Sequence, residues 1–164
     1  MMTAMSLSAL AAAASEKLPV KLIYNASPSV PMGLYWTDDA PLKRGDFVLI
    51  EVPPSARNLT KVRGYLPPGV PLLKRVRALE GDQVCRLGET VLIGGQAVAI
   101  ALKADHQGRA LPVWQGCFTL GKSEIFVLAD HAASFDSRYF GRIGTGLVIA
   151  RAVPLTLWPG KEQP

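Results

Sequence analysis

The residues best suited to chemistry in this sequence are two serines in a turn and one lysine. The segment YNASPSVPMGLY runs from Tyr24 to Tyr35, and its small residues and prolines predict an extended turn that presents Ser27 and Ser29 outward. A serine hydroxyl becomes a nucleophile only when a base takes its proton, and a neutral lysine amine can do so without histidine. Taken alone, such a turn is more typical of an ordinary surface loop.

The lysine is Lys74, which lies in an apolar segment that we predict to be a strand. Because side chains alternate along a strand, Lys74 lies between Leu72 and Val76 on one face. If that face is the core side, burial lowers the pKa of the amine from ~10.4 towards the roughly 7–8 of a general base. Such a drop costs about 4 kcal/mol. An ordinary lysine would instead extend its amine to water.

Other sites of known chemistry are incomplete. His106 lies in a polar loop, and His131 has no G-x-S-x-G nucleophile segment to serve. There is no H-E-x-x-H segment and no phosphate-binding glycine loop, so we expect no metal and no cofactor. Two cysteines, Cys85 and Cys117, are the right number for one disulfide in an oxidising compartment, or are two free thiols in the cytosol.

The elements that must position these residues are mostly strands. Short apolar runs recur between turn signals, and Gly94-Gly95 and Asp105–Gly108 are typical of hairpin loops. The sequence therefore predicts a mainly β domain. The predicted strands are Val20–Tyr24, Phe47–Val52, Leu72–Leu79, Val91–Ile93, Ala97–Leu102, Ile125–Ala129 and Gly146–Val153.

One short helix is expected in the first half of the chain. Ser55 would cap it, and the helix would run over Ala56–Leu66 until Pro67-Pro68 stops it. Leu59 and Val62 recur on one face, which we expect to be buried together with Leu66.

Size and charge favour a single domain with a mildly basic surface. The chain has 164 residues, 49% of them hydrophobic, and a net charge of +5. The densest basic group, Lys74–Arg77, lacks the aromatic residues that nucleic-acid platforms interleave, so no nucleic-acid partner is expected. Residues 3–14 are apolar and uncharged, typical of a signal segment or a truncated membrane anchor, with an Ala-rich tail as the alternative. We therefore expect a tail over 1–16, a domain over 17–164, and export.

Four segments occur in the order of a known family. They are SVPMGLY at Ser29–Tyr35, RGDFV at Arg44–Val48, LKRV with EGD within 73–82, and SFDSRYFG at Ser134–Gly141. Together they resemble the type I signal peptidases (peptidase family S26). Within that family they are similar to the TraF-type peptidases of conjugative transfer systems, which share the S-x-P-x-G-L-Y segment. The similarity extends from residue 24 to residue 153.

The resemblance implies a role for each matching polar residue. Ser29 would be the nucleophile and Lys74 the general base. The Ser27 hydroxyl would help the Ser29 backbone N–H to form the oxyanion hole, where one donor is typically worth ~10²–10³ in kcat. Ser134 would orient the lysine amine.

The resemblance also implies the supporting structure. Asp136 and Arg138 would form a structural ion pair, and would share a face if they lie on a strand. The family fold is a signal-peptidase-like body of coiled antiparallel sheets, here with one short helix and a small β cap around 88–121. Cys85 and Cys117 flank that cap, and a disulfide between them would close a loop of about 33 residues, worth roughly 3–4 kcal/mol.

The implied activity is that of a serine endopeptidase with a Ser/Lys dyad. It would cleave an exported precursor, a conjugative pilin by resemblance, at the periplasmic face of the bacterial inner membrane, with the membrane surface as a second partner. The precursor would bind extended against a sheet edge with small side chains near the cleavage point; resolution by a substrate amine would cyclise the product. The alternatives are a LexA-like self-cleaving Ser/Lys domain and a non-enzymatic, partner-binding β-domain of a transfer apparatus.

Overall fold

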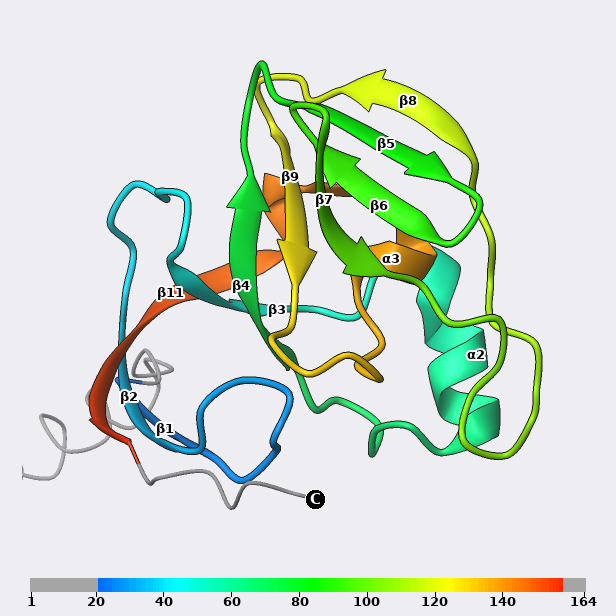
Figure 1. Ribbon diagram of the computed structural model, residues 1–164. Coiled ribbons are helices and arrows are strands. Elements are labelled where there is room, and N and C mark those ends of the chain that lie inside the picture. The colour runs from blue at the N-terminus through cyan, green and yellow to red at the C-terminus, as the bar shows by residue number, and fades with distance from the viewer. Residues whose placement is uncertain (1–20, 158–164) are drawn as a thin grey trace, which may run out of the picture.

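Two antiparallel sheets build most of the protein. The computed structural model describes residues 21–157, so the expected tail over 1–16 lies outside the described residues. The large sheet is seven-stranded, and the small sheet has four strands (Figure 1). In spatial order the large sheet contains β1 (Leu22–Asn25), β2 (Gly33–Asp38), β11 (Val148–Leu157), β3 (Phe47–Ile50), β4 (Leu72–Ala78), β9 (Glu124–Leu128) and β10 (Ile143–Gly144). The prediction of a mainly β fold is confirmed.

The small sheet packs at one end of the large one. Its order is β7 (Gln96–Ile100), β6 (Thr90–Ile93), β5 (Gln83–Leu87) and β8 (Gly116–Thr119). Gly94 and Gly95 form the tight turn between β6 and β7, as expected, and both have positive φ. The sheet packs through Val84 and Val91 against Phe126 of β9. It overlaps the region 88–121 and begins five residues earlier.

The centre of the large sheet is apolar on both faces. Val48 and Ile50 of β3 pack with Val76 of β4 and Val127 of β9 in one cluster. On the other face Phe47 and Leu49 pack with Tyr35 and Leu73. A strand in this position reads as a nearly continuous apolar run because both of its faces are covered.

The helix predicted near residue 56 exists, with different ends. Helix α2 covers Pro54–Arg63, and its N-cap is Pro53 with no side-chain cap. Pro54 already supplies a helical φ and lacks an N–H in need of a partner, so the capping role predicted for Ser55 is wrong. Gly64, with φ of 66°, ends the helix before Leu66. The buried positions are Ala56 and Thr60, whereas Val62 is exposed.

Several strands and a second helix escape the sequence patterns. β2, β5 and β8 were not among the predicted strands, and β11 continues four residues beyond Val153. The segment that carries Asp136 and Arg138 is not a strand: Asp136 caps helix α3 (Ser137–Phe140), and its side chain accepts a hydrogen bond from the Arg138 N–H. Four residues are too few to produce a recognisable helical period.

Gly33 allows β2 and β11 to approach each other closely. At this residue, which begins β2, φ is 151°, and a Cβ there would lie 2.1 Å from the Thr156 carbonyl oxygen of β11. β11 has a bulge between Pro154 and Thr156, opposite β2. Only glycine fits this approach, which fixes where the turn before β2 meets the sheet.

A disulfide joins two strands of the small sheet, and a buried arginine connects this sheet to α3. Cys85 of β5 lies opposite Cys117 of β8, and their sulfurs are 2.01 Å apart, the separation of a disulfide. Arg86, which is fully buried, donates to the carbonyl oxygen of Arg138 (2.7 Å) in α3 and to that of Gly88 (3.1 Å). The small sheet therefore reaches the segment that holds Asp136 and Arg138.

Candidate active site

The turn that carries the two serines is held by a buried asparagine. The Asn25 amide donates to the carbonyl oxygens of Ser27 (2.9 Å), Val30 (3.1 Å) and Pro31 (3.1 Å). Its own Oδ1 accepts the Ser27 N–H. The Tyr35 hydroxyl also donates to the Pro31 carbonyl. The backbone of this turn is thus fixed by side chains at both of its ends.

Ser27 and Ser29 lie against one another at the surface of this turn. The Ser27 hydroxyl donates to Ser29 Oγ over 3.1 Å, and the Ser29 N–H donates to Ser27 Oγ over 3.3 Å. Both contacts are long for their types, so the Ser27 hydroxyl and the Ser29 N–H are held only by weak hydrogen bonds.

Lys74 is buried as the strand alternation predicted. It lies in β4 opposite Val48 of β3, and only 3% of its surface is exposed. Burial lowers the pKa of Lys74 from 10.5 to about 8; the charge of Asp136 opposes this effect and that of Arg138 adds to it. Since the two neighbouring charges act in opposite directions, burial decides the outcome. A tenth of the molecules then carry a neutral amine at about pH 7.

The segment 129–138, which contains Ser134, is held in place by an ion pair between two of its own residues. Arg138 Nη2 lies 3.0 Å from Asp136 Oδ2, and both side chains are buried. Arg138 also donates to the carbonyls of Ala129 and His131, while the Ala129 N–H donates to Asp136. These bonds hold the loop before α3, which carries Ser134.

Asp130 ties the nucleophile turn to the lysine strand. Its backbone N–H donates to the Ser29 carbonyl over 2.9 Å. Its carboxylate accepts two bonds from Arg75, at 3.1 and 2.8 Å. Because Arg75 is the residue after Lys74, one aspartate links the segments of both reactive groups.

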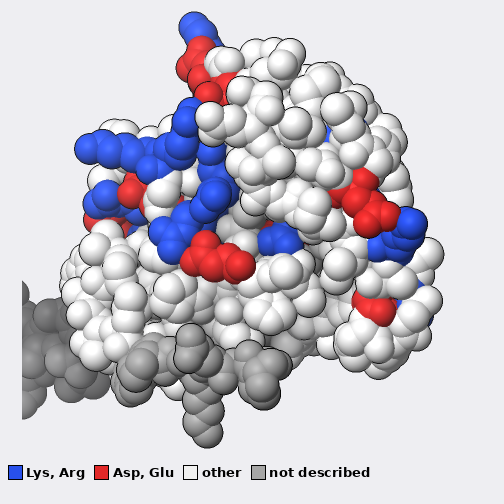
Figure 2. Space-filling view, viewed as in Figure 1, with Lys and Arg blue, Asp and Glu red and all other residues white. Residues whose placement is uncertain are grey.

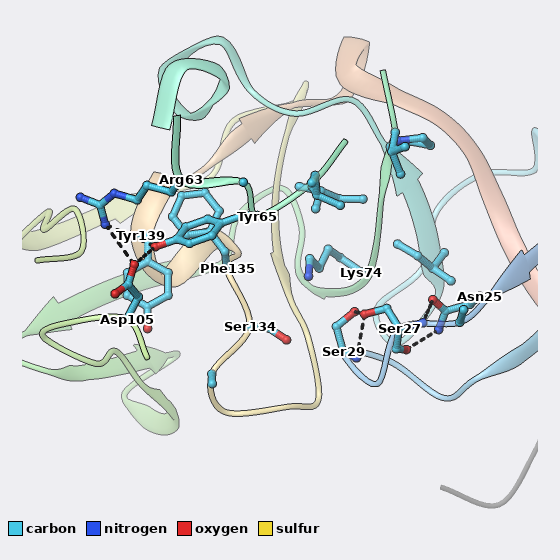
Figure 3. A pocket seen from close by; sticks show the side chains of 18 of the residues that line it. Asn25, Ser27, Ser29, Arg63, Tyr65, Lys74, Asp105, Ser134, Phe135 and Tyr139 are labelled. Atoms are coloured by element: carbon cyan, nitrogen blue, oxygen red, sulfur yellow. Dashed lines mark hydrogen bonds and ion pairs between the residues drawn. The ribbon is translucent and has the colours of Figure 1, made fainter. Parts of the chain in front are cut away.

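A single cavity of about 940 Å³ brings these segments together. Figure 3 shows Ser29, Lys74 and Ser134 around it, with the Lys74 amine directed into the cavity. All four polar residues assigned by the resemblance to direct roles line this cavity, namely Ser27, Ser29, Lys74 and Ser134. Asp136 and Arg138 lie behind its wall and make the ion pair expected of them.

The remaining polar side chains near the site do not form a metal centre. Among residues 21–157, no group of three or more His, Cys, Asp or Glu side chains is placed to hold a metal ion. His106 is exposed and lines the cavity. His131 Nδ1 accepts the Ala133 N–H and so helps to shape the loop.

Sequence reasoning missed the residues that shape the site through long-range contacts. Arg86 is buried and bonds the Arg138 carbonyl 52 residues away, and the pairing of Asp130 with Arg75 joins positions 55 residues apart. Asn25 carried a local signal, since asparagine two residues before a turn serine often bonds the turn backbone.

Comparison with known proteins identifies the family. Residues 1–158 match the family described as signal peptidase, peptidase S26. The chain is 36% identical over 146 residues to an Escherichia coli plasmid transfer protein TraF, and the alignment covers 82% of each protein. It is 32% identical over 142 residues to the conjugal transfer protein TraF of Agrobacterium fabrum, covering 80% of each.

A further relative and one solved structure were also found. The probable conjugal transfer protein TraF of Sinorhizobium fredii is 36% identical over 141 residues, covering 78% of this chain and 73% of the relative. The crystal structure of a signal peptidase I from Enterococcus faecalis aligns with 73% of this chain and 100% of its own, with 23% identity and a TM-score of 0.41. On the family match and the sequence relatives, this chain belongs to the signal peptidase family, peptidase S26.

Proposed function

We propose that this protein is a serine endopeptidase in which Ser29 is the nucleophile and Lys74 the general base. The observation that carries the proposal is a lysine that is almost fully buried, with its pKa lowered to about 8, in the cavity that Ser29 also lines. A charge-bearing group held in an apolar strand at such a cost is typical of a reactive site.

The proposed reaction follows from the positions of these groups. The neutral Lys74 amine takes the proton from Ser29 Oγ as that oxygen attacks the scissile carbonyl carbon. The Ser29 N–H and the Ser27 hydroxyl donate to the oxyanion of the tetrahedral intermediate. Lys74 then gives its proton to the leaving amine, and the acyl-enzyme forms. Ser134, at the wall of the cavity, orients the Lys74 amine during both transfers.

Water or a substrate amine completes the reaction. Attack by water on the ester carbon releases the acid and returns the proton to Ser29 by way of Lys74. Attack by the substrate's own amino group gives a cyclic product instead. The two products differ by one water molecule, so the mass of the product separates them.

The proposed substrate is an exported precursor, specifically a conjugative pilin. Membership of the signal peptidase family supports an exported substrate, and the relatives named as conjugal transfer proteins support a role in conjugation. Within the described residues β1 is one of the two edge strands of the large sheet, and Ile23, Tyr24 and Asn25 line the cavity. An extended precursor segment adds to this edge and leads to Ser29.

We also propose that the protein works at a membrane surface. Leu22 and Trp36 are exposed and lie opposite one another on β1 and β2, and Leu155 is exposed on the neighbouring β11. Tyr24, on the same face as Leu22, also lines the cavity, so this apolar face adjoins the site. Tryptophan and tyrosine are favoured at the interface between lipid and water. No helix among residues 21–157 is long and apolar enough to cross a bilayer.

The distribution of charge on the molecular surface agrees with a membrane next to the apolar face of β1, β2 and β11. Figure 2 shows Lys and Arg gathered on the upper left of the viewed face, over the connection between β2 and β3 and over β4. The lower half, where the serine turn and the segment after α2 lie in Figure 1, carries few charges. A face with few charges favours an apolar precursor segment lying along the membrane.

The disulfide supports the periplasmic side. A bond between Cys85 and Cys117 persists in an oxidising compartment and is rarely kept in the cytosol. Alkylation of the protein before and after reduction, read by mass, tests it. Two alkylated thiols without prior reduction would contradict the periplasmic assignment.

The deciding experiment is precursor processing in bacterial membranes that contain a conjugative pilin precursor. The wild type is compared with Ser29→Ala and Lys74→Ala, and with the matched surface variants Ser55→Ala and Lys122→Met. Circular dichroism establishes that all five proteins fold. We expect both site variants to lose processing and both surface variants to keep it. Processing by folded Ser29→Ala, or none by the wild type, would favour a partner-binding module instead.

A further inference from the structure

The cavity extends well beyond the reactive groups, to an end lined by aromatic and aliphatic side chains. This end consists of Tyr65, Leu102, Leu111, Phe135 and Tyr139, which we call the aromatic box. Phe135 directly follows Ser134 in the chain, so the box begins next to the proposed reaction centre. Figure 3 shows Tyr65, Phe135 and Tyr139 on the opposite side of Lys74 from Ser27 and Ser29.

The three rings of the box are packed against each other. Phe135 and Tyr139 are stacked, with ring centroids 5.5 Å apart and planes within 2°. Tyr65 meets Phe135 at 5.4 Å and an angle of 52°. Tyr139 is buried, whereas Tyr65 and Phe135 are only half-buried and keep part of their ring surface open to the cavity. Rings fixed in this way offer a rigid apolar surface.

The polar atoms of the box already have partners. The Tyr65 hydroxyl donates to Asp105 over 2.6 Å, and the Tyr139 hydroxyl accepts the Leu102 N–H over 3.0 Å. The box therefore offers its faces rather than its hydroxyls to a ligand. A polar or charged side chain placed there would lose its bonds to water without replacement.

The Asp105 carboxylate at the rim of the box is paired with two arginines of the protein. Asp105 lies 2.7 Å from Arg109 Nε and 3.6 Å from Arg63 Nη1. Arg63 also donates to the Ala110 carbonyl, which joins α2 to the loop that carries Asp105. This network fixes the Tyr65 ring and leaves no acidic side chain to attract a basic one.

We propose that the aromatic box binds a large apolar side chain, aromatic or long aliphatic, of the precursor close to its scissile bond. The proposal rests on the proposed peptidase function. The box is a second specificity pocket, separate from the region that accepts the small side chains expected next to the cleavage point. Phe135 follows Ser134 in the chain, and an extended precursor advances about 3.3–3.6 Å per residue, so the proposed position of the large side chain is within about three residues of the scissile bond.

The size of the cavity supports this assignment. Sites for small molecules enclose roughly 300–1,000 Å³, and this cavity of about 940 Å³ is near the upper limit. Small side chains alone would leave the box filled with water against apolar walls. A ring or a long aliphatic chain buries that surface, which favours binding in proportion to the apolar area covered.

The test uses the full-length chain in detergent micelles and a mixed library of proteome-derived peptides as the probe. Mass spectrometry identifies each cleaved bond, and one preferred peptide is then made with Phe or Ala at the selected position. Leu102→Trp places a larger side chain in the box and so narrows it. Leu102 is 38% exposed, so the larger side chain can be accommodated. Leu87→Trp, the same change at an exposed residue outside the cavity, is the control. Phe135→Ala is a second variant, which widens the box.

We expect large apolar residues to be enriched at one position within about three residues of the cut, with kcat/KM about tenfold or more higher for Phe than for Ala there. Leu102→Trp and Phe135→Ala should reduce this ratio and Leu87→Trp should keep it. Cleavage with no such enrichment, or an unchanged ratio in both box variants, overturns the proposal. If the wild type cleaves no peptide at all, the peptidase function itself is overturned.

Discussion

Replacing Lys74 by methionine should make the protein more stable while abolishing its activity. Methionine has about the length of lysine and carries no charge, so it fills the same space in β4. The pKa of Lys74 is about 8 in the folded protein and 10.5 in the absence of burial. At roughly 1.36 kcal/mol for each pH unit, this difference corresponds to about 3 kcal/mol lost from the free energy of unfolding at pH 7.

The free energy of unfolding should depend on pH differently in the wild type and in Lys74→Met. Below pH 8 the folded wild type holds a buried charge and carries the full cost. Between about pH 8 and 10.5 the folded state has released its proton while the unfolded state still binds it, so the free energy of unfolding rises with pH. The advantage of Lys74→Met should therefore shrink over this range and vanish near its upper end.

Urea or thermal unfolding followed by circular dichroism at several pH values measures both effects. For a protein of this size, about 3 kcal/mol corresponds to a rise of ~6–12 °C in Tm at pH 7. Lys122→Met, at an exposed position, is the control and should change Tm little at any pH. The reasoning is refuted if Lys74→Met is no more stable than the wild type at pH 7. It is also refuted if the gain stays constant up to pH 10.

Three further predictions concern catalysis and the small sheet. The kcat/KM for precursor cleavage should rise with pH and level off above about pH 8, with about a tenth of the plateau at pH 7; a flat profile from pH 6 to 9 would exclude Lys74 as the base. Ser27→Ala should lower kcat by roughly 10²–10³ with little change in Tm, because the side chain is exposed; single-turnover kinetics with unchanged kcat would contradict its role. Arg86→Met should lower the free energy of unfolding by about 2–4 kcal/mol, because the buried Arg138 carbonyl loses its donor; a urea midpoint equal to that of the wild type would contradict it.

Four residues that the family resemblance singles out line one cavity, whereas several elements around them were not predicted from the sequence. Strand alternation put Lys74 on one face with Leu72 and Val76 but left open whether that face is buried, and the structure shows that it is. β5 was missed since Arg86, although buried, makes the segment look polar. No local pattern indicates a buried arginine whose partners are backbone carbonyls of distant segments.

The aromatic box also could not be predicted from local sequence patterns. Tyr65 follows α2 and Tyr139 belongs to α3, so their rings meet only when helix and loop have docked. The ordered segments of the family resemblance cover Phe135 and Tyr139 and contain nothing of Tyr65. A pocket assembled from three separate segments becomes visible only in three dimensions.

The position of β11 makes the completion of the large sheet depend on the pairing of segments that are far apart in the sequence. The strand β11 lies between β2 and β3 in the large sheet, so its pairing joins the β1–β2 hairpin to β3 and β4. A ribosome-bound chain that lacks residues 148–157 holds Ser29 and Lys74 on two pieces of sheet with no strand between them. Pairings between such distant parts of a chain form slowly and late. The cavity that Ser29 and Lys74 line is therefore expected to form late in folding.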